Sequence, residues 1–65
     1  MENKQIEICI ICKNENENIK IWLDWHKSIG VDKVYFFDNN DKYDLSQYQI
    51  ISNYNDQSFI RYINF

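Results

Sequence analysis

The chain has 65 residues, 45% of them hydrophobic, with seven Lys and Arg against ten Asp and Glu and a formal net charge of -3. A chain of this length forms one domain at most, because about 60 residues bury only roughly 60% of the surface that they expose when unfolded. The acidic balance argues against nucleic acid or an anionic membrane as partner, and the apolar content excludes disorder.

The N-terminus lacks the features of a targeting segment. Met1 to Gln5 is not basic, and no long apolar stretch follows it, so we expect neither a signal peptide nor a transmembrane helix. The two cysteines are too few for a disulfide framework. A cytoplasmic protein is the expectation.

The first half of the chain has the pattern of a strand followed by a helix. Residues 6–12 (IEICIIC) form a short, β-branched, apolar run, which predicts a parallel strand covered on both of its faces. From residue 19 the apolar period becomes helical, and Gly30 stands where a left-handed helix end is expected. The predicted apolar stripe consists of Ile19, Trp22, Leu23, His26 and Ile29, widened by Ile21 and Trp25.

Residues 31–37 (VDKVYFF) predict a second strand, which ends in Asp38-Asn39-Asn40-Asp41. Together with the helix between them, the two strands make a βαβ unit, and such units are right-handed in about 98% of cases. We therefore expect the two strands to be parallel and to end at the same edge of the sheet.

The last third is predicted to add a short helix and a third strand. Leu45, Tyr48, Ile51 and Tyr54 recur every three residues, which favours a helix capped by Asp44, although Tyr48 to Ser52 could instead form a strand. Residues 58–65 (SFIRYINF) alternate as a strand, with Phe59, Ile63 and Phe65 left without a later element to pack against. The expected fold is α/β in the order β-α-β-α-β, with a three-stranded, mainly parallel sheet.

Two features that resemble functional motifs favour a structural interpretation. Cys9 and Cys12 have the spacing of a metal or redox pair, but side chains three apart in a strand point to opposite faces. We therefore expect two buried, inert thiols. His26, the only histidine, lies on the apolar stripe and is expected to be a packed side chain bonded to a neighbour.

The candidate binding residues follow the first two strands. Lys13-Asn14-Glu15 comes after the first strand and Asp38-Asn39-Asn40 after the second. Ligands of open parallel sheets bind beyond the carboxyl ends of the strands. Asp38 would suit ribose hydroxyls or a uracil imide, and Lys13 a phosphate. Solvated turns, which Asn and Asp also favour, explain the residues about equally well.

The order of these motifs resembles the opening of glycosyltransferases of the GT-A fold, particularly family 92 and family 2-like proteins. The resemblance runs from Ile6 onward and is strongest up to Asp41. It is carried by Lys13-Asn14-Glu15, Trp25-His26, Ile29-Gly30-Val31-Asp32 and Phe37-Asp38-Asn39-Asn40-Asp41, with a weaker echo in Tyr54 and Ser58 to Ile63.

The resemblance implies that the chain is the N-terminal nucleotide-sugar-binding segment of a glycosyltransferase, a single partial domain over residues 1–65 with a Rossmann-like fold. It implies a UDP-linked donor held by Asp38 at the base or ribose, and a pocket lined by Cys12, Lys13, Asn14 and Glu15, with Asn39 and Asn40 beside them.

The chain departs from the family by what it lacks. No Asp-x-Asp motif occurs, and no carboxylate can be assigned as catalytic base. In a full-length enzyme of this kind, Mn²⁺ or Mg²⁺ is expected to neutralise the departing diphosphate. We therefore expect no catalytic residue, no metal ligand and no sugar transfer by this chain alone. Two further interpretations are a non-catalytic βαβ interaction module and, less in keeping with the single acid after the first strand, a receiver-like domain using Asp38. Self-association or pairing with the remainder of such a domain is also expected, because the sheet edges are open.

Overall fold

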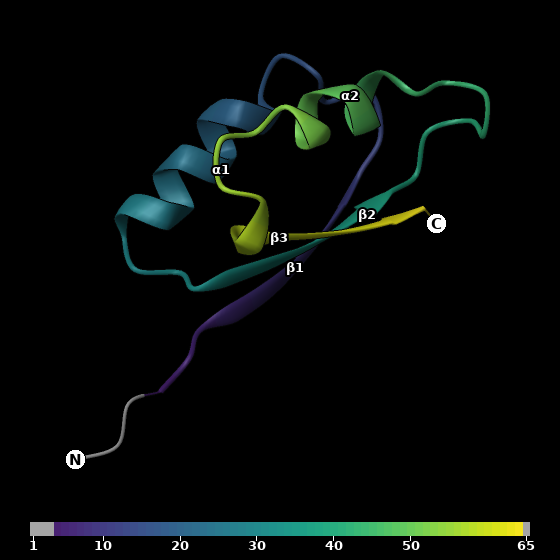
Figure 1. Ribbon diagram of the computed structural model, residues 1–65. Coiled ribbons are helices and arrows are strands. Elements are labelled where there is room, and N and C mark those ends of the chain that lie inside the picture. Colours follow the sequence, from purple (N-terminus) through teal and green to yellow (C-terminus); the bar gives the residue numbers. More distant parts are fainter. Residues whose placement is uncertain (1–3, 65) are drawn as a thin grey trace.

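A computed structural model describes residues 4–64. Three strands and two α-helices alternate along the chain, with one 3₁₀ turn before the last strand (Figure 1). The elements are β1 (Glu7–Cys12), α1 (Ile19–Ser28), β2 (Lys33–Asp38), α2 (Ser46–Ser52), η1 (Gln57–Phe59) and β3 (Ile60–Asn64). The predicted β-α-β-α-β order is confirmed.

The strands form one fully parallel sheet in the order β1-β2-β3. Cys12 pairs with Asp38, and Asp38 pairs with Asn64, so all three strands end along one edge. This edge brings together the segments that follow β1 and β2, as the right-handed crossover predicts.

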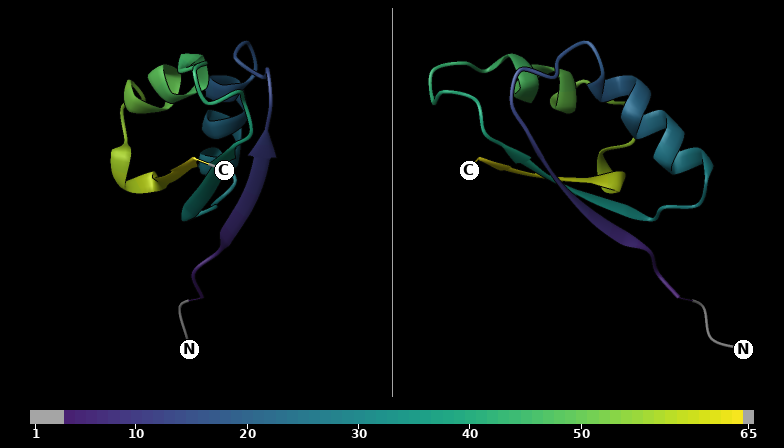
Figure 2. Two further views of the ribbon diagram at one scale, coloured as in Figure 1. Left: turned by 90° about the vertical axis from the view of Figure 1, so that its right-hand side faces the viewer. Right: turned by 180° about the vertical axis from the view of Figure 1, so that it is seen from behind.

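Both helices cover the same face of the sheet (Figures 1 and 2). The core lies between the helices and this face of the sheet. It consists of Cys12, Ile19, Leu23, Val34, Phe36, Ile51, Tyr54, Phe59 and Ile60. Leu23 and Val34 are 0% exposed and Phe36 is 1% exposed. Burial of each such side chain stabilises the fold by about 1.5–3 kcal/mol.

The opposite face of the sheet is not covered by any element within residues 4–64, so the expectation of a strand buried on both faces is wrong for β1. Its side chains alternate between the covered and the open face, and Ile11 on the open face is 60% exposed. Cys9 is also exposed, which corrects the prediction that both thiols are buried. The apolar run is a strand with only one face packed.

The end of α1 follows the predicted pattern. Gly30 has φ +99°, and its N–H donates to the carbonyl of Lys27 while the N–H of Val31 donates to that of His26. This pair of bonds is a Schellman motif, which needs a residue that adopts the left-handed region easily. The apolar stripe is narrower than expected, because Ile29 and Trp25 are 56% and 58% exposed.

The second half differs from the predicted pattern in its apolar contacts. α2 is a helix, and the Asp44 carboxylate accepts the N–H of Ser46 at its start. Leu45 and Tyr48 of the expected stripe are 53% and 45% exposed, whereas Gln47 is fully buried. The third strand starts at Ile60, later than predicted.

Phe59, for which no later element was expected, packs against an earlier part of the chain. It lies in η1, is 4% exposed, and its ring packs near that of Tyr54. Ile63 is partly buried, on the open face of the sheet. Phe65 lies outside the described residues.

Candidate functional site at the strand ends

The two segments predicted to bind a ligand are in direct contact. The N–H of Asn39 donates to the carbonyl of Cys12 over 2.8 Å, and the N–H of Asn14 donates to Oδ1 of Asn40, also over 2.8 Å. Asn14 has φ 58°, a left-handed conformation that Asn tolerates better than most residues. This bend turns its N–H towards β2. The loops after β1 and β2 therefore form one surface.

Asp38 is the centre of this surface and is buried, with 3% exposure. Its Oδ1 accepts bonds from the Gln47 amide at 2.7 Å and from the N–H of Asn40 at 3.0 Å. Its Oδ2 accepts the hydroxyl of Tyr62 at 2.6 Å. A buried carboxylate needs such donors, because an unpaired charge in the interior is costly.

Gln47 joins α2 to both strand ends. Its amide nitrogen donates to Asp38 and also to the carbonyl of Cys12 at 3.1 Å, while its carbonyl oxygen accepts the N–H of Glu15 at 3.0 Å. With 0% exposure, this side chain replaces water as the partner of three polar groups. We call Asp38, Gln47, Tyr62 and the carbonyl of Cys12 the strand-end network.

Burial sets the protonation of the network. It raises the pKa of the Tyr62 hydroxyl, and the bond to Asp38 adds to the effect, so the phenol keeps its proton. Burial likewise raises the pKa of the Cys12 thiol, helped by the charges of Glu15 and Asp38. A neutral, buried thiol is a poor nucleophile, which agrees with the inert role predicted for Cys12.

The predicted site residues divide into an inner and an outer group. Cys12, Asp38 and Asn40 are buried, whereas Lys13, Asn14, Glu15 and Asn39 are exposed. Both carboxylate oxygens of Asp38 already have donors from the chain. The exposed group therefore offers the surface that a ligand would meet first, and the inner group fixes its shape.

Asn40 carries one unsatisfied donor. Its Oδ1 accepts the N–H of Asn14, but its buried Nδ2 has no hydrogen-bond partner. A buried polar atom without a partner costs about 1–3 kcal/mol. A ligand acceptor or a water molecule that reached this donor would relieve the cost.

Gln47 and Tyr62 were not identified from the sequence. Tyr62 had one usable signal, since the alternation of the last predicted strand places it on the same face as Ile60. Gln47 had none, because a polar residue near the start of a helix is ordinarily solvated. Only the placement of α2 over the strand ends makes it a core residue.

The remaining sequence candidates behave as structural residues. Cys9 is exposed and Cys12 is buried, on opposite faces of β1. The Nδ1 atom of His26 lies 2.8 Å from the carbonyl oxygen of Trp22, and its ring packs against Trp22 and Trp25. The prediction of a packed, hydrogen-bonded histidine is confirmed.

The described residues form no cluster of side chains typical of a metal site. Between residues 4 and 64, no three His, Cys, Asp or Glu side chains are grouped so that they could hold an ion.

An apolar cavity of about 250 Å³ lies beside the site, between β1 and α1. Its lining is Ile10, Ile11, Cys12, Glu15, Asn18, Ile19, Trp22 and Phe36. Among these lining residues, Glu15 and Asn18 have side chains that form strong hydrogen bonds.

No known protein family, curated protein or solved structure matches the chain. In the described part of the chain, no helix has the length and apolar character needed to cross a bilayer.

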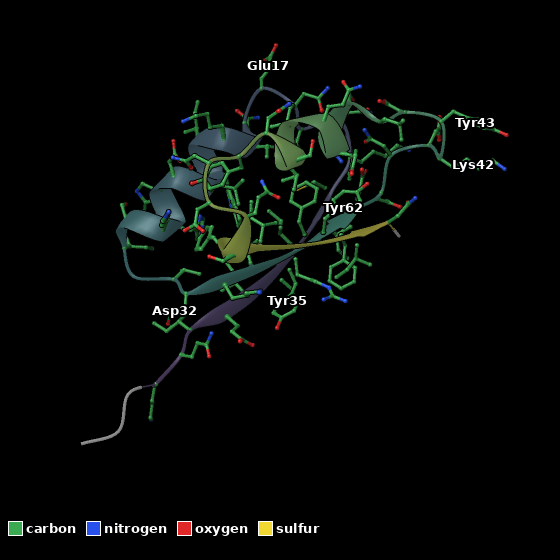
Figure 3. All side chains as sticks on the ribbon, viewed as in Figure 1. Glu17, Asp32, Tyr35, Lys42, Tyr43 and Tyr62 are labelled. Carbon is green, nitrogen blue, oxygen red and sulfur yellow. The ribbon has the colours of Figure 1, made fainter. Side chains whose placement is uncertain are left out.

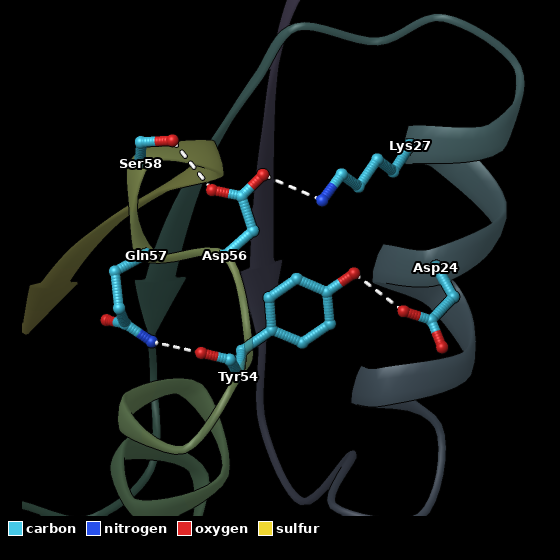
Figure 4. Close-up of polar contacts among 6 residues, drawn as sticks. All are labelled: Asp24, Lys27, Tyr54, Asp56, Gln57 and Ser58. Atoms are coloured by element: carbon cyan, nitrogen blue, oxygen red, sulfur yellow. Dashed lines mark hydrogen bonds and ion pairs between the residues drawn. The ribbon is translucent and has the colours of Figure 1, made fainter.

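A second polar cluster lies away from the strand ends and joins α1 to the segment before β3 (Figure 4). The hydroxyl of Tyr54 donates to Asp24 at 2.6 Å, and Lys27 pairs with Asp56 at 2.7 Å. Burial and the bond to Asp24 raise the pKa of Tyr54 to about 12. The bond from Lys27 lowers the pKa of Asp56 to about 2, with a smaller contribution from Ser58. We call Asp24, Lys27, Tyr54 and Asp56 the helix-side cluster.

Proposed function

We propose that the chain is the nucleotide-sugar-binding segment of a glycosyltransferase, with the donor held at the strand-end edge. The observation that carries the proposal is the contact between the loops after β1 and β2 around the buried Asp38. These are the segments that the resemblance to GT-A glycosyltransferases assigns to the nucleoside. Their meeting at the carboxyl ends of parallel strands is the usual place for a nucleotide.

The exposed residues supply the chemistry that a UDP-sugar requires. The Lys13 ammonium can pair with a phosphate, Asn39 and Asn14 can bond the uracil edge or the ribose, and Glu15 can accept a ribose hydroxyl. Asp38 acts as a positioning residue in this proposal. It holds the second loop in place through the N–H of Asn40, and both of its carboxylate oxygens already accept bonds from the chain.

Sugar transfer is not part of this proposal for the chain by itself. Among the described residues, no group of three or more His, Cys, Asp or Glu side chains could hold a metal ion, and the sequence contains no Asp-x-Asp motif. Binding is therefore the activity to measure.

The test is calorimetry with UDP and with UDP-glucose, on the wild-type chain and on Lys13→Ala and Asn39→Ala. Both residues are exposed, so the variants should fold. We expect each variant to bind at least about fivefold more weakly, the loss of roughly 1 kcal/mol that one hydrogen bond or ion pair provides. Lys4→Ala is the matched control, since Lys4 is exposed beyond the opposite end of β1. Equal affinity for all four proteins, or no binding by the folded wild type, contradicts the proposal.

The alternative function, a non-catalytic interaction module, is favoured by one observation. The strand-end network satisfies Asp38 and Gln47 from within the chain, as a purely structural network would. Absence of nucleotide binding by a well-folded chain is the result that would select this alternative.

A further inference from the structure

The free edge of β1 and one side of α1 form an apolar corner that no described element covers. β1 is an edge strand, because within residues 4–64 it pairs with β2 alone. Above it, Trp22, Trp25 and Ile29 occupy one side of α1 at helical spacing; we call these three residues the α1 flank. Lys27 of α1 and its partner Asp56 lie on the other side of the helix, towards η1 (Figure 4).

The corner is continuous between its two parts. The cavity between β1 and α1 is lined by Ile10 and Ile11 of the strand and by Trp22 of the helix. Trp25 and Ile29 extend the same side of the helix and are 58% and 56% exposed. Ile11 also lines the cavity, but its side chain lies on the open face of the sheet, where it is 60% exposed. Apolar side chains gathered beside an unpaired strand edge are typical of an interaction surface.

The backbone of β1 determines how another strand can pair with it. The carbonyls of Ile6 and Cys12 accept bonds from the β2 side of the strand. Because backbone groups alternate in direction along a strand, the N–H and C=O groups of Glu7, Cys9 and Ile11 point out from the free edge. A pairing strand must therefore meet these odd-numbered residues with outward-pointing groups of its own.

We propose that this corner binds a second copy of the chain through antiparallel pairing of the two β1 strands, with Ile10 facing Ile10 of the second copy. This register brings outward-pointing residues together, with Cys9 opposite Ile11 of the second copy. It also places Glu7 opposite Lys13 of the second copy, twice in the dimer. Opposite charges across a strand pair stabilise it, and both side chains are exposed in the single chain.

Antiparallel pairing of two identical strands implies a two-fold axis between the copies, and this axis completes the apolar contact. An axis perpendicular to the sheet beside β1 leaves both α1 helices on the same side of the joined sheet and turns each α1 flank towards the other. The surface is therefore complementary to itself in backbone direction, charge and apolar character, as an isologous dimer requires. A register centred on Cys9 would instead set Glu7 opposite Ile11 and lose the charge pairing.

The first test measures association by sedimentation equilibrium over a concentration series that extends into the millimolar range. The wild-type chain should dimerise. Glu7→Lys and Lys13→Glu should each weaken the dimer about tenfold, because each turns two attractive pairs of up to about 1 kcal/mol into repulsive ones. The double variant with both changes should recover most of the wild-type affinity. Asp41→Lys and Lys42→Glu, which make the same changes of charge in the exposed loop after β2, should leave association unchanged.

The second test locates the register. Ile11→Cys places a thiol opposite Cys9 of the second copy, and facing residues of an antiparallel pair lie within the Cα separation that a disulfide spans. Oxidation with diamide should link this variant into a covalent dimer, whereas Ile11→Cys combined with Cys9→Ser should stay unlinked. A chain that is monomeric at every concentration, a dimer indifferent to both charge reversals, or cross-linking of the wild type through Cys9 overturns the proposal. The readout uses no nucleotide, so it is independent of the proposed binding function.

Discussion

The strand-end network and the helix-side cluster contain the same pair of groups in different surroundings. In each, a tyrosine hydroxyl donates to an aspartate over 2.6 Å: Tyr62 to Asp38, and Tyr54 to Asp24. Asp38 is 3% exposed, whereas the Asp24 side chain is 49% exposed and also pairs with Lys20. Figure 3 shows Tyr62 rising from β3 towards the helices, whereas Tyr35 points away on the open face.

The comparison teaches that geometry alone does not determine how much a hydrogen bond contributes to the stability of the fold. Water can replace Tyr54 as a donor to Asp24, because that carboxylate is solvated. Water cannot easily replace Tyr62 or Gln47 at Asp38, so a lost donor there leaves a buried charge short of a partner. We therefore expect equal substitutions to have unequal effects in the two regions.

Gln47→Glu should have the largest effect. It replaces the amide that donates to Asp38 at 2.7 Å with a second carboxylate. We expect a loss of at least about 3 kcal/mol at pH 7, a large part of the roughly 3–10 kcal/mol that stabilises a domain of this size. Urea denaturation followed by circular dichroism measures it.

The pH dependence of this variant provides its internal check. The new carboxyl would have a raised pKa in the folded state, so its unfavourable contribution should shrink as the pH falls and it takes up a proton. Stability should therefore partly recover towards pH 4. Gln49→Glu, on the exposed face of the same helix, should stay within about 0.5 kcal/mol of wild type. Equal effects at both positions would contradict the role given to Gln47.

Tyr62→Phe and Tyr54→Phe form the direct test of the comparison. Removal of the Tyr62 hydroxyl should cost about 1.5–3 kcal/mol, the range for bonds to charged groups in the interior. Removal of the Tyr54 hydroxyl should cost less than about 1 kcal/mol, because its acceptor is solvated. Chemical denaturation of both variants at pH 7 decides the order. A larger loss for Tyr54→Phe would reverse the account.

The loss of stability at alkaline pH should depend on the same two tyrosines. The pKa of Tyr54 is raised from 10.0 to about 12, and that of Tyr62 is also raised. Since the folded state holds these protons more tightly than the unfolded chain, their contribution is complete below pH 10 and is lost as the pH rises through the folded-state values. Tyr62→Phe should flatten this decline above pH 10. An unchanged slope would show that Tyr62 does not cause it.

The smallest effect is expected for the exposed ion pair between Lys27 and Asp56. The pKa of Asp56 is lowered to about 2, so its contribution is present above its unfolded value of 3.8 and is lost as the pH falls towards 2. Lys27→Gln should reduce the acid-induced loss of stability between pH 4 and pH 2. Lys4→Gln is the control and should not. If Lys27→Gln leaves the loss of stability between pH 4 and pH 2 unchanged, the ion pair is not maintained in solution.

The order of the elements could be predicted from sequence because local patterns determine it. The apolar runs of β1 and β2, the helical period from Ile19 and the single glycine at Gly30 each indicate one structure, and all agree with the observed fold. The meeting of Cys12 and Asp38 at one sheet edge followed from the right-handed crossover alone. These predictions needed no knowledge of long-range contacts.

The contents of the strand-end network could not be predicted, because they depend on where α2 lies over the sheet. Gln47 is polar and buried, while Leu45 and Tyr48 are apolar and exposed, which reverses the usual preference on which apolar periodicity relies. Phe59 was misplaced for a similar reason, since the 3₁₀ turn at its position moves the start of β3. The open face of the sheet was missed because an apolar run does not show how many of its faces are packed.

The most direct test of the proposed function is an NMR titration of the folded chain with UDP, following the backbone amides. The account predicts shifts that saturate and that concentrate on Lys13 to Glu15 and on Asn39 and Asn40, with little change at Lys4 or in α1. Binding should also move the signal of the Asn40 side-chain amide, whose buried donor has no partner. Shifts confined to other parts of the chain, or none at all in a folded sample, would contradict a nucleotide site at the strand ends.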